Sequence, residues 1–290
     1  MRKNRMTRWV LAIVICLAMT GCAKDINNPD SGRVTVAVSI VPQKAFVEAV
    51  CKDLAEVVVL VPPGYSPESY EPTPKETEKF LRAKIYFTIG VPAESAKILS
   101  GAEGTGDMKI VRLEEKAALC CPDRVFDAGD RDPHIWLSPK RVRSMIEAIA
   151  EEMSLLDPDN KETYGNNAKE YIEELKKLDN RITELFSGIE NRLFIVFHPA
   201  FGYLADDYGL DMRSLEEEGK EATAQGLREM IDLAKSEDVK VIFFQAEASS
   251  RQAVAFAEEI GGSAVVLDPL SEDYINNMEH MANAIAGAMK

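Results

Sequence analysis

The 290-residue sequence is acidic, with 48 Asp and Glu residues against 34 Lys and Arg residues and a formal net charge of −14 at pH 7. Beyond the N-terminal segment no basic patch or stripe of Lys and Arg remains, which argues against a partner with a phosphate backbone and so excludes a nucleic-acid-binding class. The acidity favours solubility and attracts cations at long range, but it does not define a site.

The N-terminus is typical of a secretion signal. Four basic residues fall among the first eight positions, an apolar stretch covers 9–19, and Thr20 and Gly21 precede Cys22. The apolar stretch is shorter than the about 20 residues that cross a bilayer. The segment resembles a bacterial lipoprotein signal, which implies cleavage before Cys22 and a lipid on that residue, although Met19 replaces the usual Leu. Plain cleavage and a retained anchor are the alternatives.

From residue 33 onward, short apolar runs alternate with helical patterns, which predicts parallel strands joined by crossover helices. The first group of predicted elements consists of strands at 34–40, 56–61, 84–88 and 109–113 and helices at 43–52, 75–82 and 93–99.

Two helical patterns then follow each other, and the second is long. They cover 139–155 and 159–187 and are separated at Asp157-Pro158. About 29 residues at 1.5 Å per residue give a helix of about 43 Å, enough to run the length of a two-lobed molecule. The alternation then resumes with strands at 193–197, 239–244 and 264–267 and helices at 200–208, 223–235, 249–260 and the C-terminus.

This order of elements predicts an α/β protein with two parallel-sheet lobes joined by one long helix. The acidic run at 216–218 is interpreted as a solvated loop. The predicted organisation is a signal peptide at 1–21, a lipid-anchored tether at 22–32, an N-terminal lobe at 33–138, linking helices at 139–188 and a C-terminal lobe at 189–290.

Three cysteines lie outside the signal and the proposed lipid site, namely Cys51, Cys120 and Cys121. An odd number cannot pair fully within one chain, and one of the adjacent pair could form a disulfide with Cys51. Cys51 ends a helical pattern, where a small buried hydrophobic residue is the more frequent role. The three do not have the C-x-x-C spacing of zinc sites.

Polar residues directly after predicted strands are the candidate ligands, because the loops at the carboxyl ends of parallel strands converge on a crevice. Imidazole suits zinc and other later transition metals, whereas carboxylate oxygen suits harder ions such as manganese, so two of each fit either ion. The four candidates are Glu68 after the second strand, His134 at the end of the central loop, His198 directly after strand 193–197 and Asp268 directly after strand 264–267.

Each candidate has an ordinary alternative. A single histidine at a strand end more often forms structural hydrogen bonds than binds a metal. Glu68 could be an exposed loop acid, and Asp268 before Pro269 could cap the last helical region. His280 lacks a strand-end context and is expected at the surface, and Trp136 is expected to pack beside His134.

Four segments, in this order, resemble the zinc/manganese solute-binding protein family of ABC transporters (ZnuA/TroA-like, cluster A-I), over nearly all of the mature chain. The resemblance implies two Rossmann-like lobes, a rigid backbone helix and a metal ion bound between the lobes, and it gives the ligand role to His134, His198 and Asp268. The segments are Val61-Pro-Pro-Gly-Tyr-Ser-Pro-Glu-Ser-Tyr-Glu-Pro-Thr-Pro74, Asp132-Pro-His-Ile-Trp-Leu-Ser-Pro139, Phe197-His-Pro-Ala-Phe-Gly-Tyr203 and Val266-Leu-Asp-Pro-Leu270.

The first motif departs from the family, which usually has Ser-Pro-His where this chain has Ser66-Pro67-Glu68. A carboxylate can bind a metal, so Glu68 is the expected substitute ligand, with Glu71 as the alternative. The segment 120–131 also lacks the histidines that zinc-dedicated members often carry before the second motif. Exchanging imidazole for carboxylate moves the preference from zinc toward manganese or iron.

The sequence therefore predicts a monomeric, extracytoplasmic lipoprotein that captures one zinc or manganese ion, or iron, and delivers it to an ABC permease without catalysis. Because ligation needs neutral imidazole, affinity is expected to fall below about pH 6, near the ordinary histidine pKa. The alternatives are a surface adhesin or structural lipoprotein with a degenerate metal site, and a zinc hydrolase. The sequence contains neither an H-E-x-x-H motif nor a nucleophile elbow, which argues against the zinc hydrolase.

Overall fold

A computed structural model describes residues 33–94, 96–104, 108–126, 128–216, 223–246 and 250–289. The signal segment, the proposed lipid site Cys22 and the tether at 22–32 lie outside the described residues. None of the helices in the described part of the chain combines the length and the apolar character needed to cross a membrane.

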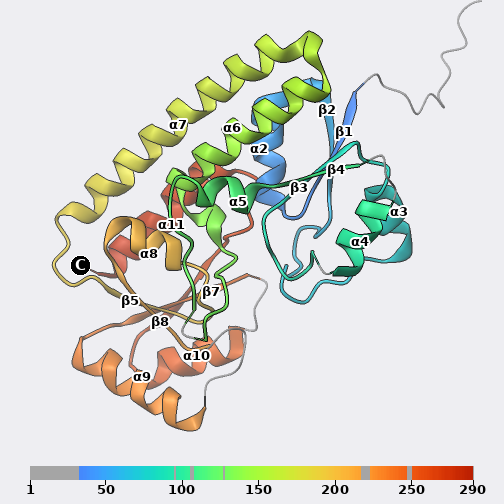
Figure 1. The fold of residues 1–290 in the computed structure, drawn as a ribbon. Coiled ribbons are helices and arrows are strands. Elements are labelled where there is room, and N and C mark those ends of the chain that lie inside the picture. The colour runs from blue at the N-terminus through green and yellow to red at the C-terminus, as the bar shows by residue number, and fades with distance from the viewer. Residues whose placement is uncertain are drawn as a thin grey trace, which may run out of the picture. The chain divides into compact units, whose positions relative to one another are not determined.

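The first lobe is built on a parallel four-stranded sheet with the order β2-β1-β3-β4. The central strand β3 is buried along its whole length, as expected for a sheet that helices cover on both faces. Figure 1 shows these elements in blue to green. The strands are β1 (Val34–Val38), β2 (Ala55–Val59), β3 (Ile85–Thr88) and β4 (Lys109–Arg112), and the helices are α2 (Val41–Cys51), α3 (Pro74–Phe80), α4 (Ala96–Gly104) and α5 (Leu113–Ala118), with a 3-10 turn η1 (Lys52–Leu54).

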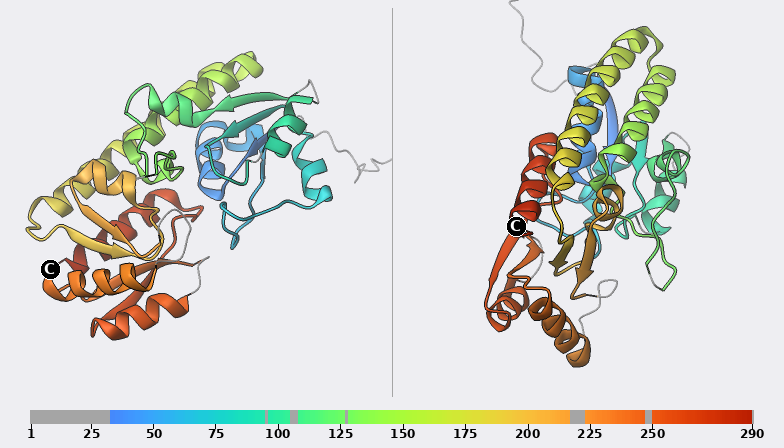
Figure 2. Two further views of the ribbon diagram at one scale, coloured as in Figure 1. Left: turned by 60° about the horizontal axis from the view of Figure 1, so that its bottom comes forward. Right: turned by 90° about the vertical axis from the view of Figure 1, so that its left-hand side faces the viewer.

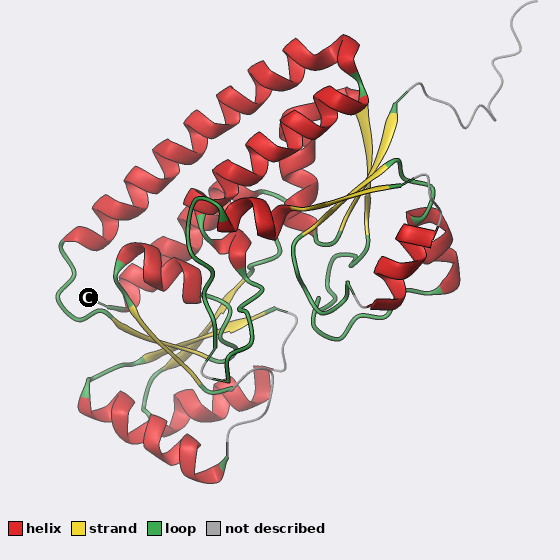
Figure 3. Cartoon of the chain, in the orientation of Figure 1, coloured by secondary structure: helices red, strands yellow, loops and turns green. Residues whose placement is uncertain are grey.

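The second lobe repeats this topology, with the parallel order β6-β5-β7-β8. Its central strand β5 is likewise buried at every position. Figure 3 shows the two sheets in yellow, each with helices packed beside it. The strands are β5 (Leu193–Val196), β6 (Asp211–Ser214), β7 (Val241–Gln245) and β8 (Ser263–Leu267), and the helices are α8 (Gly202–Tyr208), α9 (Ala224–Ser236), α10 (Ser250–Glu259) and α11 (Tyr274–Ala288).

Two long helices join the lobes. After the 3-10 turn η2 (Ile135–Leu137), α6 (Pro139–Leu156) leads through η3 (Pro158–Asn160) into α7 (Lys161–Ser187). The 27 residues of α7 give a length of about 40 Å, and the helix runs beside α6 (Figures 1 and 2). Its buried residues Leu175, Leu178, Ile182 and Phe186 recur at helical spacing, which creates one apolar stripe.

That stripe belongs to a hydrophobic core that contains residues of both lobes. α7 also makes polar contacts with each lobe. The Asn167 side chain donates to the carbonyl oxygen of Val50 in α2 at 2.9 Å, and Arg181 forms an ion pair with Glu279 in α11. The predicted fold class, two α/β lobes with parallel sheets and one long connecting helix, is confirmed.

Two elements were not predicted from the pattern. Strand β6 has the sequence Asp-Met-Arg-Ser and alternates between exposed and half-buried positions at the sheet edge, so it lacks the apolar run that identifies the other strands. Helix α5 begins directly after β4, with no turn residue between them to separate the two patterns. Cys51 is buried and Cys120 is exposed, and all three described cysteines are free.

Candidate metal centre

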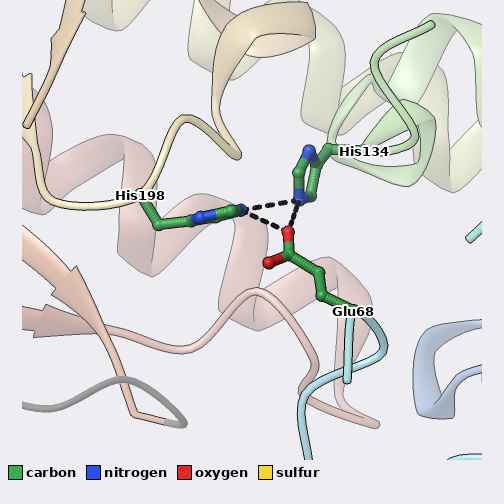
Figure 4. A group of neighbouring side chains, drawn as sticks. All are labelled: Glu68, His134 and His198. Carbon is green, nitrogen blue, oxygen red and sulfur yellow. Dashed lines mark hydrogen bonds and ion pairs between the residues drawn. The ribbon is translucent and has the colours of Figure 1, made fainter. Parts of the chain in front are cut away.

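Glu68, His134 and His198 bring one ligand atom each into a single group in which all three atoms lie within 4.8 Å of one another. The Nε2 atoms of the two histidines are 3.3 Å apart. The Oε1 atom of Glu68 lies 2.6 Å from Nε2 of His198 and 3.7 Å from Nε2 of His134 (Figure 4). Both histidines are buried and Glu68 is partly buried. Three of the four residues expected to bind a metal therefore meet.

Each side chain comes from a different loop that the backbone holds in place. Glu68 lies in the loop after β2, where its N–H donates to Ser66 Oγ and where the neighbouring Pro67 carbonyl accepts from the Ala93 N–H at 2.8 Å. His198 lies two residues after the end of β5, and the Phe197 N–H between them donates to the Phe243 carbonyl of β7 at 2.7 Å, which extends the strand pairing. The fold therefore positions these two side chains through main-chain hydrogen bonds.

A carboxylate lies behind each imidazole. Nδ1 of His134 is 2.8 Å from Oδ1 of Asp132, and Nδ1 of His198 is 2.8 Å from Oε2 of Glu216. An ionised carboxylate can only accept a hydrogen bond, so each pair places a proton on Nδ1, and a ring in its neutral form then has its Nε2 lone pair free for a metal. Metal-binding histidines are usually oriented in this way by a second carboxylate or carbonyl.

Asp132 is fully buried, and its charge is compensated by a network. Its Oδ1 accepts from the His134 N–H, and its Oδ2 accepts from Nη1 of Arg124 at 3.1 Å. The Tyr203 hydroxyl donates to the Asp132 carbonyl and accepts from the Arg124 N–H. These contacts stabilise a buried carboxylate that would otherwise be costly to desolvate.

Charges in the group shift two pKa values in opposite directions. Burial acts to raise the pKa of Glu68, but the hydrogen bonds from His134 and His198 outweigh it and lower this pKa to about 2. Burial acts to lower the pKa of His198, but the bonds to Glu216 and Glu68 raise it to about 9. Without an ion, Glu68 is therefore negative and His198 is positive at neutral pH. The imidazolium proton is the charge that a bound cation would displace.

The geometry of the group suits a small divalent ion. Two nitrogen ligands at about 2.05 Å from a tetrahedral zinc ion are about 3.4 Å apart, close to the 3.3 Å between the histidine Nε2 atoms. Two histidines and one glutamate are also a ligand set that zinc takes in proteins, with a fourth position left for another ligand. The oxygen of Glu68 would move away from Nε2 of His198 by less than 1 Å to share such an ion with both rings, an estimate from the same zinc distances.

Asp268, the fourth residue expected to bind a metal, is not part of this group within the described residues. It is exposed directly after β8, where its Oδ1 accepts from the Leu270 N–H at 3.0 Å. It also lines a cavity of about 240 Å³ together with the segment 61–64, which leads into the loop of Glu68. Asp268 caps a turn in this structure and does not cap α11, whose N-cap is Asp273.

Three other residues singled out in the sequence, Glu71, His280 and Trp136, lie outside the group within the described residues. Glu71 and His280 are exposed and stand outside the group. Trp136 is buried, its ring centroid lies 5.3 Å from that of His134, and its Nε1 donates to the Pro269 carbonyl. It is a packing residue that also joins the segment after β8 to the segment before α6.

Two residues of the site were missed. The acidic run at 216–218 was expected to be solvated, but the described member, Glu216, is only 18% exposed and contacts His198. The unpredicted edge strand β6 carries Glu216 to this place, so no local pattern could indicate it. Asp132 had a signal, since an Asp two residues before a histidine can accept from that residue's own N–H.

Comparison with known proteins agrees with the fold and shows the family. Residues 36–288 match the family described as "Zinc-uptake complex component A periplasmic". The chain is 31% identical to the high-affinity zinc uptake system protein ZnuA of Bacillus subtilis, over 90% of this chain and 86% of that protein. It is 30% identical to the zinc-binding lipoprotein AdcA of Streptococcus pneumoniae, but it spans only 59% of that longer protein.

A solved structure shows the same architecture. The crystal structure of a ZnuA protein superimposes with a TM-score of 0.83 and 35% sequence identity, covering 89% of this chain and 100% of that chain. The region that matches the family, residues 36–288, contains α7, all three residues of the group and both sheets except the first two residues of β1.

Proposed function

This chain belongs to the ZnuA family, the periplasmic component A of the zinc-uptake complex, and from that membership we propose that it captures one zinc ion between its lobes outside the cytoplasm and delivers it to an ABC importer. The zinc ion is cargo, so the site must bind it tightly and later release it. No covalent bond is made or broken in this function.

The observation that supports the proposal most strongly is the convergence of Glu68, His134 and His198 around one point. The first comes from the N-terminal lobe, the second from the segment before α6 and the third from the C-terminal lobe. An ion held by all three would therefore join the lobes. The carboxylates of Asp132 and Glu216 orient the two imidazoles toward the same point, which reduces the cost of organising the site on binding.

Zinc is the proposed ion, although Glu68 replaces the histidine that the family usually carries. Carboxylate oxygen alone would favour a harder ion such as manganese. The spacing of the two Nε2 atoms and the two-histidine, one-glutamate set both fit tetrahedral zinc. Manganese would require more oxygen ligands than this group supplies, so weaker manganese binding is part of the proposal.

Asp268 is proposed as the fourth ligand in the metal-bound state. Asp268 lines a cavity together with residues 61–64, and this segment directly precedes the loop of Glu68 in the chain. In this proposal a closure of the lobes, or a shift of that loop, brings the carboxylate to the ion. The turn contact to the Leu270 N–H uses Oδ1, so ligation through Oδ2 is compatible with the turn.

The proposed anchor is a lipid on Cys22, which holds a monomer at the membrane next to its permease. Membrane fractionation tests this step. The wild-type chain is expected in the detergent-soluble membrane fraction, and Cys22→Ala is expected to lose the lipid mass and the membrane association. Equal membrane association of both would show that another segment anchors the chain.

The alternatives make different predictions about the site. A surface adhesin with a degenerate site does not need two buried histidines, each paired with its own carboxylate, and the intact group argues against it. A zinc hydrolase would use the fourth position for water and would hydrolyse generic ester or peptide substrates. Zinc-dependent turnover lost in His134→Ala would favour that function instead.

A titration of chelator-treated chain tests the proposal. Zinc, manganese and ferrous iron are added separately in competition with a chromogenic chelator, and the metal content of protein purified without added metal is measured. We expect one zinc ion per chain and zinc affinity above manganese affinity. The proposal fails if none of the three ions binds at one ion per chain, or if manganese binds more tightly than zinc.

A further inference from the structure

Cys120 and Cys121 bring two free thiols together at the end of α5, apart from the Glu68, His134 and His198 group. Their Sγ atoms are 3.0 Å apart, and neither forms a disulfide. Adjacent side chains point to opposite sides of an extended chain, so their convergence needs a special backbone. Here the N–H groups of both cysteines donate to the same carbonyl, that of Ala117, at 3.1 and 3.2 Å.

The geometry of neighbouring residues disfavours a disulfide between them. Consecutive Cα atoms across a trans peptide are about 3.8 Å apart. Disulfides usually join Cα atoms about 4.4–6.8 Å apart, and shorter separations store strain that makes the bond easier to reduce. Cys51 is fully buried in α2 and offers no accessible partner. The reduced dithiol is therefore the expected resting form.

The surroundings hold the pair while leaving it accessible. Cys120 is exposed and Cys121 is partly buried. Pro122 follows directly, and its carbonyl accepts from Nη2 of the buried Arg141 at 3.0 Å. Burial and the hydrogen bond with Cys120 raise the pKa of the Cys121 thiol, and Arg141 only partly offsets this rise. A centre that bonds to both sulfur atoms must displace the proton of each thiol.

We propose that Cys120 and Cys121 form a bidentate site for a thiophilic metal or metalloid centre, a second site that is independent of the proposed zinc site. Two sulfur ligands select soft ions, whereas the imidazole and carboxylate group selects a borderline or harder ion. One chain would then hold two ions of different chemical class. The turn preorganises both thiols, which makes the second bond to the same centre effectively intramolecular.

Phenylarsine oxide is the suitable probe, because trivalent arsenic bonds to thiols and has little affinity for imidazole or carboxylate. In the reaction two S–H bonds and the As=O bond are lost, two As–S bonds form and one water molecule leaves. The arsenic stays trivalent, so no oxidant or reductant is consumed. The two thiol groups supply both protons of the water.

The experiment measures arsenical bound per full-length chain by intact mass, in protein kept reduced with a phosphine. Cys120→Ser and Cys121→Ser each keep one thiol on the same turn, and the double variant reports the background from the other cysteines. We expect wild type to hold one more phenylarsenic group than the double variant, resistant to excess monothiol and removed by a dithiol. Each single variant is expected to bind at least about a hundredfold more weakly, because chelation is lost.

The outcomes separate this site from the zinc site. Retention of the arsenical by His198→Ala, folded by circular dichroism, supports independence, whereas its loss there overturns it. Binding by a single variant as tight as by wild type overturns the bidentate site. The bidentate site is also overturned if wild type and the double variant bind equal numbers of phenylarsenic groups per chain. It is overturned as well if Cys120 and Cys121 of the isolated wild-type chain remain oxidised in the presence of the phosphine. Failure of zinc binding with intact arsenical binding would refute only the proposed function.

Discussion

The Nε2 atoms of His134 and His198 lie 3.3 Å apart although 64 positions separate the two residues in the chain. Each ring is held from behind by a carboxylate at 2.8 Å, so the two Nε2 atoms face one point. The positive charge of the His198 ring is offset by Oε1 of Glu68, which lies 2.6 Å from Nε2 of His198 and 3.7 Å from Nε2 of His134. A divalent cation at this point would bind both imidazoles and the Glu68 carboxylate together, which a single proton cannot do.

The first prediction concerns metal-dependent stability. Zinc at a hundredfold excess over its Kd should stabilise the wild-type chain by about 2.7 kcal/mol, because it binds only the folded state. His198→Ala should abolish this gain, whereas His280→Ala, which changes an exposed histidine on α11, should keep it. Thermal unfolding of chelator-treated protein with and without zinc measures both. An unchanged zinc shift in His198→Ala would contradict the site.

The second prediction concerns Glu68. Glu68→Gln keeps the size of the side chain but removes the charge, and it should weaken zinc binding by about tenfold or more, the equivalent of about 1.4 kcal/mol. Glu71→Gln is the matched control, since Glu71 is exposed three residues further along the same loop. Glu68→His should restore binding and raise the preference for zinc over manganese. Competition titrations give all three affinities, and equal loss in both Gln variants would argue against a specific role of Glu68.

The third prediction concerns the carboxylates behind the rings. Glu216→Gln and Asp132→Asn should each lower metal affinity by about 10–100-fold, the usual effect of losing such a partner. They should differ in the stability of the metal-free protein. Asp132 is fully buried and paired with Arg124, so its loss should lower the melting temperature, whereas Glu216 is 18% exposed and should cost less. Isothermal titration combined with unfolding of metal-free protein separates the two effects, and unchanged affinity in both variants would refute the orienting role.

The fourth prediction concerns pH. The pKa of His198 is about 9 in the folded metal-free chain and about 6.5 when unfolded, so its charged form stabilises the fold fully below pH 6.5. That contribution should be lost as pH rises through 9, and the metal-free protein should melt at progressively lower temperature over this window. The depressed pKa of Glu68 contributes stability above pH 4.5, lost as pH falls through 2.

Zinc binding should show the opposite trend over the same pH window. Because the ion displaces the His198 proton, apparent zinc affinity should rise with pH up to about 9, and not only up to the pH of about 6 expected from an ordinary histidine. Proton release measured in buffers of different ionisation enthalpy checks this directly. Binding that releases no proton at pH 7.5 would contradict the shifted pKa.

The fifth prediction separates the two roles open to Asp268. Asp268→Asn keeps the Oδ1 acceptor for the Leu270 N–H, so the turn after β8 should be preserved. If the carboxylate is the fourth ligand, zinc affinity should fall while the metal-free melting temperature stays unchanged. Asp273→Asn, at the N-cap of α11, is the control on the same segment. Unchanged affinity in Asp268→Asn would assign Asp268 to the turn alone.

The sequence by itself indicated the alternation of strands and helices, the long α7 and the four loops that carry candidate ligand side chains. Those features are local, because burial of a strand or of one helix face requires apolar residues at a regular spacing in the sequence. His198 directly after the apolar run of β5 is an example, since the end of the run fixes its place at the sheet edge. The thiol pair was likewise visible as adjacency, but not as a 3.0 Å contact.

Only the tertiary structure decided which of those side chains meet. Glu216 reaches His198 because β6 pairs with β5 in parallel register, and the sequence of that edge strand carries no apolar pattern. Asp268 follows β8 much as His198 follows β5, but β7 lies between β8 and β5 in the order β6-β5-β7-β8, whereas β6 adjoins β5. Distances between loops depend on strand order, register and the packing of the lobes on α7, and none of these leaves a periodic trace in the sequence.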